Sequence, residues 1–156
     1  MKIIVLKWII LIMNLQSNRN NINYWNIINE INWYQLSKDK NHKEAVNKVK
    51  EFCVKNYDFY TLVDLNNFTW EKKTLLKNKI FSFFKSLSSE EKNGKYNSFM
   101  SDDFCDDTAS HIVGLGETFY NYMLDNIDEI FILKNKVVEN FRYGISMAQE
   151  EVIHFS

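Results

Sequence analysis

The chain has 156 residues, of which 46% are hydrophobic and 15% are aromatic, and its formal net charge is −1. These values exclude a wholly disordered chain, which has few aromatic residues and a high net charge. They also argue against a nucleic-acid-binding protein, which needs a basic surface. The length predicts one domain with a hydrophobic core, and the lack of proline with only 4 glycines favours helices. We therefore predict an all-α fold, a compact single-domain bundle of about six helices.

Residues 1–20 are predicted to be an extension, apolar and then rich in asparagine, that precedes a single helical domain over residues 21–156. Residues 1–13 are too short to cross a bilayer, which takes about 20 apolar residues. They are not followed by the small-residue cleavage site of a signal peptide. Two interpretations stay open: a peripheral membrane anchor, or an upstream extension with Met13 as the true start, which we favour. Membrane contact is predicted only if residues 1–13 are native.

The spacing of apolar residues predicts four helical segments in the first half of the domain. The first covers Asn21 to Leu36, and the second covers His42 to Lys55 with lysines on its outer face. A short apolar turn or helix follows from Asp58 to Asn66. Thr69 is a suitable N-cap, so a separate helix from Thr69 to Leu87 is predicted to be the central packing helix.

The second half is predicted to begin with a polar loop from Ser88 to Lys95. Beyond the acidic segment described next, a helix is expected from Glu117 to Leu124. A further helix is capped by Asp128 and broken by Gly144, and a last short helix reaches the C-terminus.

The stretch from Ser101 to Gly116 contains the densest group of acidic residues in the chain. Ser101 or Asp102 can cap a helix here, because serine and aspartate accept hydrogen bonds from the free N–H groups of the first turn. Gly114 is predicted to follow this helix in the left-handed conformation. The carboxylates that we expect to face water in its first turns belong to Asp102, Asp103, Asp106 and Asp107.

Two interpretations of these carboxylates stay open. In the structural one, they complement the positive end of the helix dipole, and the lysine-rich first half of the chain attracts them within the same fold. In the functional one, they form an acidic face that binds a basic protein partner.

Asp103, Asp107 and His111 follow one another at intervals of four residues and are predicted to form a polar stripe on this helix. Carboxylates and an imidazole could hold a divalent metal, although the spacing matches no standard metal motif. A metal-dependent enzyme is therefore an alternative hypothesis.

Recognisable catalytic motifs are missing from the sequence. It has no glycine-rich phosphate loop, GxSxG elbow, HExxH pair or EF-hand loop. Cys53 and Cys105 form no CxxC or zinc pattern, and we expect both to be buried free thiols in a reducing, cytoplasmic compartment. No cofactor is predicted, and a non-enzymatic function is favoured.

Three segments resemble a bacterial family known only as domain of unknown function forty-two-forty. Tyr24 to Trp33 resembles the family's opening helix, Ser101 to Phe104 resembles its acidic turn, and His111 to Tyr120 resembles its following segment. The similarity covers about Asn21 to Asn126. It implies a helical bacterial domain and assigns no catalytic residue.

The leading hypothesis from the sequence is a non-enzymatic protein-interaction module, similar in role to an immunity protein or antitoxin. It would bind a basic protein partner through the acidic face. The alternatives are the metal-dependent enzyme and a peripheral membrane protein anchored by residues 1–13.

Overall fold

The computed structural model of the chain describes residues 21–39, 41–94, 101–133 and 135–155. Within these ranges there are eight α-helices and one 3₁₀-helix, and no strand. The prediction of an all-α fold is confirmed, with more helices than the six expected. The predictions about residues 1–20, including Met13 and a membrane anchor, lie outside the described residues.

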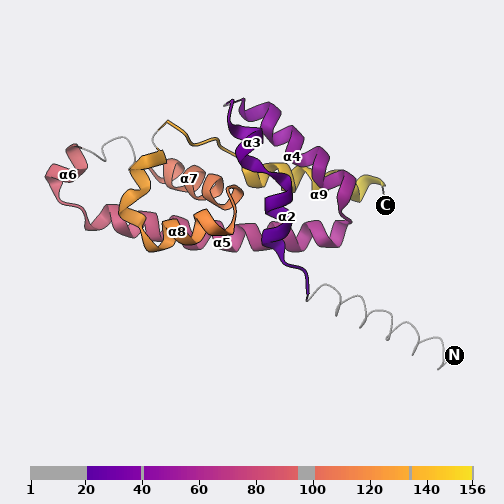
Figure 1. Ribbon diagram of the computed structural model, residues 1–156, viewed down its shortest axis with the longest axis horizontal. Helices are drawn as coiled ribbons and strands as arrows, with labels where there is room; N and C mark the ends of the chain where they lie inside the picture. Colours follow the sequence, from indigo (N-terminus) through magenta and orange to yellow (C-terminus); the bar gives the residue numbers. More distant parts are fainter. Residues whose placement is uncertain (1–20, 40, 95–100, 134, 156) are drawn as a thin grey trace, which may run out of the picture.

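The longest helix, α5, runs along most of the body (Figure 1). Helices α7 and α8 lie along its C-terminal half, and α4 and α9 lie towards its N-terminal half. The bounds of the elements are α2 Tyr24–Ile31, α3 Trp33–Ser37, α4 His42–Asn56, α5 Phe59–Ser86, α6 Ser89–Asn93, α7 Asp102–Gly114, α8 Glu117–Asp125, the 3₁₀-helix η2 Ile127–Leu133, and α9 Phe141–Phe155.

Helix α5 is continuous, so the prediction of two separate segments was wrong. It begins at the N-cap Asp58, whose carboxylate accepts a hydrogen bond from the N–H of Thr61 at 2.8 Å. Thr69, the expected cap, lies buried inside the helix and donates its hydroxyl to the Asn66 carbonyl at 2.9 Å. Because this hydroxyl is satisfied within the helix, the chain has no need to break there.

The single helix expected over residues 21–36 is instead divided into α2 and α3. Asn32 separates them in the left-handed conformation, with φ of 56°. Asparagine is one of the few residues with a side chain that visits this region readily. The break redirects the chain and places Trp33 fully inside the core.

Two further segments differ from the expectation. The predicted loop after α5 contains the short helix α6, in which Ser88 and Glu91 form a capping box. The predicted helix from Asp128 is the 3₁₀-helix η2, which ends at Leu133.

Gly144 does not break a helix but lies inside α9, where α9 crosses α4. A Cβ atom on Gly144 would lie 2.7 Å from Val49 Cβ and 2.8 Å from the Val46 carbonyl oxygen. The glycine is needed because two backbones approach closely, not because the helix ends.

One hydrophobic core joins the helices, and aromatic side chains from α2 and α3 connect its parts. Trp25 of α2 packs against Phe68 of α5 and Tyr120 of α8, with ring centroids 5.2 Å apart in both pairs. Trp33 of α3 packs against Phe141 of α9 at the same centroid distance of 5.2 Å. These contacts join α2 to α5 and α8, and α3 to α9.

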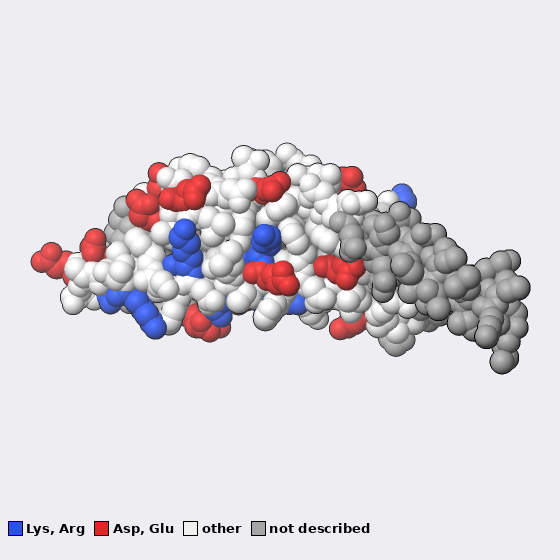
Figure 2. Space-filling view, turned by 90° about the horizontal axis from the view of Figure 1, so that it is seen from below, with Lys and Arg blue, Asp and Glu red and all other residues white. Residues whose placement is uncertain are grey.

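The charges that are separated along the sequence are mixed in space. On the face seen from below, acidic and basic side chains are interspersed, with no basic half set apart from an acidic half (Figure 2). Close packing of α5 and α7 brings the lysines of the first half next to the aspartates of the second.

Candidate functional site

The acidic segment forms α7, and its start confirms the predicted cap. The Ser101 hydroxyl accepts a hydrogen bond from the N–H of Phe104 at 3.0 Å. Asp102 and Asp103 follow in the first turn, where negative charge suits the positive end of the helix dipole.

The end of α7 differs from the prediction for Gly114. This glycine is the last residue of the helix, and the residue with positive φ is Gly116, at 97°. A Cβ atom on Gly114 would lie 2.6 Å from Trp33 Cδ1 and 2.8 Å from Phe141 Cγ. Gly114 therefore lets α3 and α9 approach the helix, while Gly116 makes the turn into α8.

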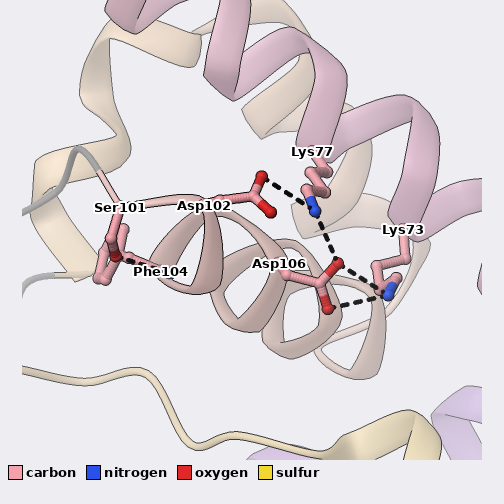
Figure 3. A network of polar contacts seen from close by, with 6 residues as sticks. All are labelled: Lys73, Lys77, Ser101, Asp102, Phe104 and Asp106. Carbon is pink, nitrogen blue, oxygen red and sulfur yellow. Dashed lines mark hydrogen bonds and ion pairs between the residues drawn. The ribbon is translucent and has the colours of Figure 1, made fainter.

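Two of the four aspartates are engaged by lysines of α5 (Figure 3). Both carboxylate oxygens of Asp106 accept hydrogen bonds from Lys73 Nζ at 2.9 Å. Lys77 Nζ lies 3.3 Å from Asp106 and 3.2 Å from Asp102. Asp106 is therefore part of an internal ion-pair network, and the expectation that it projects freely into water was wrong.

The electrostatics of Asp106 agree with this arrangement. Burial alone would raise its pKa, but the hydrogen bonds and charges of Lys73 and Lys77 outweigh burial and hold the pKa of this carboxyl below its usual range. The structural interpretation of the acidic cluster thus accounts for Asp106. It accounts in part for Asp102, whose side chain is 73% exposed.

The other two aspartates lie with Glu139 in a group that we call the acidic patch: Asp103, Asp107 and Glu139. Among the described residues, none of the three has an ion-pair or hydrogen-bond partner for its carboxylate. Burial, then the negative charges of Glu139, Asp106 and Asp103, raise the pKa of Asp107 to about 6. Glu139 precedes α9 and approaches α7 only through tertiary packing, so sequence spacing could not reveal it.

A small cavity of about 170 Å³ adjoins the acidic patch at Asp107. It is lined from α5, α7 and the start of α9, and Lys73 and Arg142 contribute to it along with Asp106. Arg142 Nε is buried there without a hydrogen-bond partner among the described residues. The cavity therefore carries both signs of charge, while the acidic patch beside it carries one.

His111 is not part of a polar stripe, which corrects that prediction. The second half of α7 is buried on all sides, and only 4% of His111 is exposed. Its Nδ1 accepts hydrogen bonds from Trp33 Nε1 at 3.0 Å and from the Val138 N–H at 3.4 Å. Burial lowers the pKa of His111 to about 4, so the imidazole is neutral near pH 7.

This position separates His111 from the two aspartates that were expected to join it in a metal site. In the part of the chain that the structure describes, no group of three His, Cys, Asp or Glu side chains is placed to hold a metal ion. Asp103 is exposed at the start of α7, while His111 points into the core near its end.

The two cysteines are buried and free, as expected. Burial raises the pKa of Cys53 to about 12. Burial, followed by the charge of Asp102, raises the pKa of Cys105 to about 11. Both thiols are therefore protonated near neutral pH, and neither is an activated nucleophile.

Comparison with known proteins gives no relative: no family model, no curated protein and no solved structure matches the chain. The resemblance to the forty-two-forty family therefore stays a prediction. None of the helices within the described ranges has the length and hydrophobicity needed to span a membrane.

Proposed function

We propose that this protein is a non-enzymatic interaction module, similar in role to an immunity protein or antitoxin, which binds a basic segment of a partner protein. The observation that carries the proposal is the acidic patch of Asp103, Asp107 and Glu139, in which no carboxylate contacts a cation of the described chain.

The pKa of Asp107 is raised first by burial and then by the negative charges of Glu139, Asp106 and Asp103. Like charges held close together disfavour ionisation, and a positive partner placed among them removes that penalty. A lysine or arginine from another protein would gain the attraction of three carboxylates. At an exposed patch, such charges mainly raise the association rate and select the partner.

The proposed surface differs from the one predicted from the sequence. Asp102 and Asp106 are paired with Lys77 and Lys73, so breaking those pairs would offset what a partner gains. Asp103 and Asp107 remain available, and Glu139 joins them.

The test is capture of partner proteins from the source cells by three forms of the protein. They are the wild type, the triple variant Asp103→Asn/Asp107→Asn/Glu139→Gln, and a control with the same charge change, Glu51→Gln/Glu71→Gln/Glu90→Gln. The control residues are exposed and lie on α4, α5 and α6. We expect the wild type and the control to retain the same basic protein, and the patch variant to retain at least tenfold less.

Added salt should weaken the captured complex, because exposed charges are screened by ions. Equal recovery of the same proteins by all three forms would remove the proposal. So would a bound protein without a basic surface.

A further inference from the structure

A second site lies where α3, α7, α8 and η2 meet. There the structure has a cavity of about 510 Å³ that is open to solvent on one side, within the range of roughly 300–1,000 Å³ that is typical of small-molecule sites. Apolar side chains form much of its wall, contributed by Leu115, Phe119, Ile132 and Leu133. A ligand must therefore have an apolar body.

His111 contributes a hydrogen-bonding imidazole nitrogen to this wall. Two N–H donors, from Trp33 and Val138, point at Nδ1, so Nδ1 is the unprotonated nitrogen and Nε2 carries the proton of the neutral ring. Among the described residues, Nε2–H has no hydrogen-bond acceptor. Nε2 is not sealed from water, and His111 lines the cavity, so we place Nε2 on the cavity side of the ring.

Ser37 is a second buried polar residue of the wall. It is 5% exposed and lines the same cavity, and its hydroxyl has no partner within the described part of the chain. The described polar atoms that are sealed from water without a partner are Thr108 Oγ1 and Arg142 Nε, so the unpartnered Ser37 hydroxyl and His111 Nε2 both reach water. The cavity thus contains two side chains, each more than nine-tenths buried, with hydrogen-bonding capacity that the protein does not use.

Two cations complete the lining. Lys38 follows α3 and Lys136 follows η2, and both are exposed residues whose long side chains reach the cavity from its edge. No described residue forms an ion pair with either of them. The two hydrogen-bond donors and the two lysines therefore all favour a ligand whose acceptor group has a negative charge.

We propose that this cavity binds a small carboxylic acid with a compact apolar body. The carboxylate accepts hydrogen bonds from His111 Nε2–H and the Ser37 hydroxyl and lies near Lys38 and Lys136. The apolar body packs on Phe119 and the aliphatic side chains. A monoanion is favoured over a phosphate ester, because moving a dianion from water to a mostly apolar wall carries a larger desolvation penalty.

The test uses three probes of similar shape: 3-phenylpropanoate, its neutral amide 3-phenylpropanamide, and phenyl phosphate. Calorimetric titration of the wild type should show saturable binding of the carboxylate, with at least tenfold weaker binding of the amide and of the phosphate. The carboxylate should also shift the nuclear magnetic resonance of the His111 Nε2 proton, which locates it in this cavity.

A surface variant keeps the fold intact and tests the cations. Lys38→Met/Lys136→Met should weaken carboxylate binding at least tenfold and leave the amide unaffected. The matched control Lys43→Met/Lys55→Met removes two exposed lysines of α4 and should bind the carboxylate like the wild type.

The proposal would be overturned by no carboxylate binding to the wild type, by equal binding of acid and amide, or by binding of phenyl phosphate as tight as that of the carboxylate or tighter. Unchanged binding by the Lys38→Met/Lys136→Met variant would also overturn it. None of these results bears on the acidic patch, because the two sites share no residue.

Discussion

At the scale of single residues, the negative charge of Asp107 lowers the stability of the folded protein. Its pKa of about 6 in the folded protein lies above the ordinary value of 3.8, so the folded state holds the proton more tightly than the unfolded chain. Ionisation therefore destabilises the fold. The penalty is absent below about pH 4 and complete above about pH 6.

We expect Asp107→Asn to stabilise the protein near pH 7. After allowance for solvent screening, the gain is on the order of 1 kcal/mol, which raises the melting temperature by about 2–4 °C. Thermal melting followed by circular dichroism measures it. The advantage should shrink towards zero at about pH 3.5, where both forms are neutral. The exposed control Glu71→Gln should melt like the wild type, and an Asp107→Asn protein that melts no higher than the wild type at pH 7 contradicts the prediction.

His111 has the opposite effect to Asp107 on the change of stability with pH. Its folded pKa of about 4 lies below the ordinary 6.5, so the folded state binds this proton less tightly than the unfolded chain. The stability that comes from a neutral imidazole is complete above about pH 6.5 and is lost as the pH falls towards 4. The total is roughly 3 kcal/mol.

Replacing His111 by a residue that cannot titrate should remove this slope. His111→Asn keeps an acceptor near the Nδ1 position, so we expect it to fold with a stability reduced by about 1–3 kcal/mol at pH 7 from lost packing. Between about pH 6.5 and pH 4, its unfolding free energy should fall much less than that of the wild type. Urea denaturation at a series of pH values measures both slopes, and Asp107→Asn is used as the common background so that Asp107 does not oppose the trend. Parallel slopes would show that His111 does not carry the acid sensitivity.

At the scale of elements, the ion pairs between α5 and α7 matter because they are partly buried. The Lys73 side chain is 14% exposed, whereas Lys48 and Glu44 in the exposed pair of α4 are 50% and 55% exposed. Exposed pairs contribute little because water screens them and the side chains lose freedom.

A double-mutant cycle with Lys73→Met and Asp106→Asn should give a coupling free energy of about 1 kcal/mol. The same cycle on Lys48 and Glu44 should give a smaller value. Urea denaturation of the single and double variants measures both couplings. If the two cycles agree within error, the α5–α7 pair does not help to fix the position of α7.

The approach of α3 and α9 to α7 depends on the absence of a side chain at Gly114. Alanine favours a helix over glycine by about 1 kcal/mol. Yet its Cβ would lie 2.6 Å from Trp33 and 2.8 Å from Phe141, both fully buried. Overpacking typically costs about 1–3 kcal/mol, and here the clash involves two rings that cannot move into water. We therefore expect Gly114→Ala to lower the melting temperature, which calorimetry measures. A higher melting temperature would show that the gain in helix propensity exceeds the cost of the clash.

The elements with clear local signals were predictable from the sequence. Helices α4, α7 and α8 have amphipathic patterns with a cap or glycine at their ends, and their observed bounds lie within a residue or two of the expected ones. The failures have local causes. Thr69 satisfies its own hydroxyl inside α5, Asn32 breaks a periodic segment, and Gly144 serves packing instead of a helix end.

The candidate sites were less predictable, because they depend on which helices become neighbours. Four aspartates near the start of one helix look equivalent in sequence. Only the packing of α5 separates the paired Asp106 from the unpaired Asp103 and Asp107. The direction of His111 follows from burial of α7 on all sides, and the cavity that it lines is formed by four separate elements.

For the whole molecule, the contact between α4 and α9 joins the third of the described helices to the last, which lie far apart along the chain. Helix α9 also packs on α5, so α9 joins α4 to α5 and the core needs all three helices in place. Contacts between segments far apart in the sequence slow folding, because the chain between them must first be brought together.

Gly144→Val should disrupt this arrangement. Its side chain would meet the Val46 carbonyl oxygen, 2.8 Å from the Cβ position, and a backbone atom cannot yield as a flexible side chain does. We expect a loss of about 3 kcal/mol and a broader calorimetric transition as α9 separates from α4. A sharp transition near the wild-type temperature would show that the crossing tolerates a side chain.

The buried hydrogen bond between Trp33 and His111 affects the fluorescence of this protein. An indole shielded from water fluoresces at shorter wavelength than an exposed one, and Trp33 is fully buried. Its N–H also touches the imidazole that borders the 510 Å³ cavity. Among the 4 tryptophans of the chain, Trp33 therefore contributes the part of the fluorescence whose wavelength and intensity report whether that region is intact or occupied.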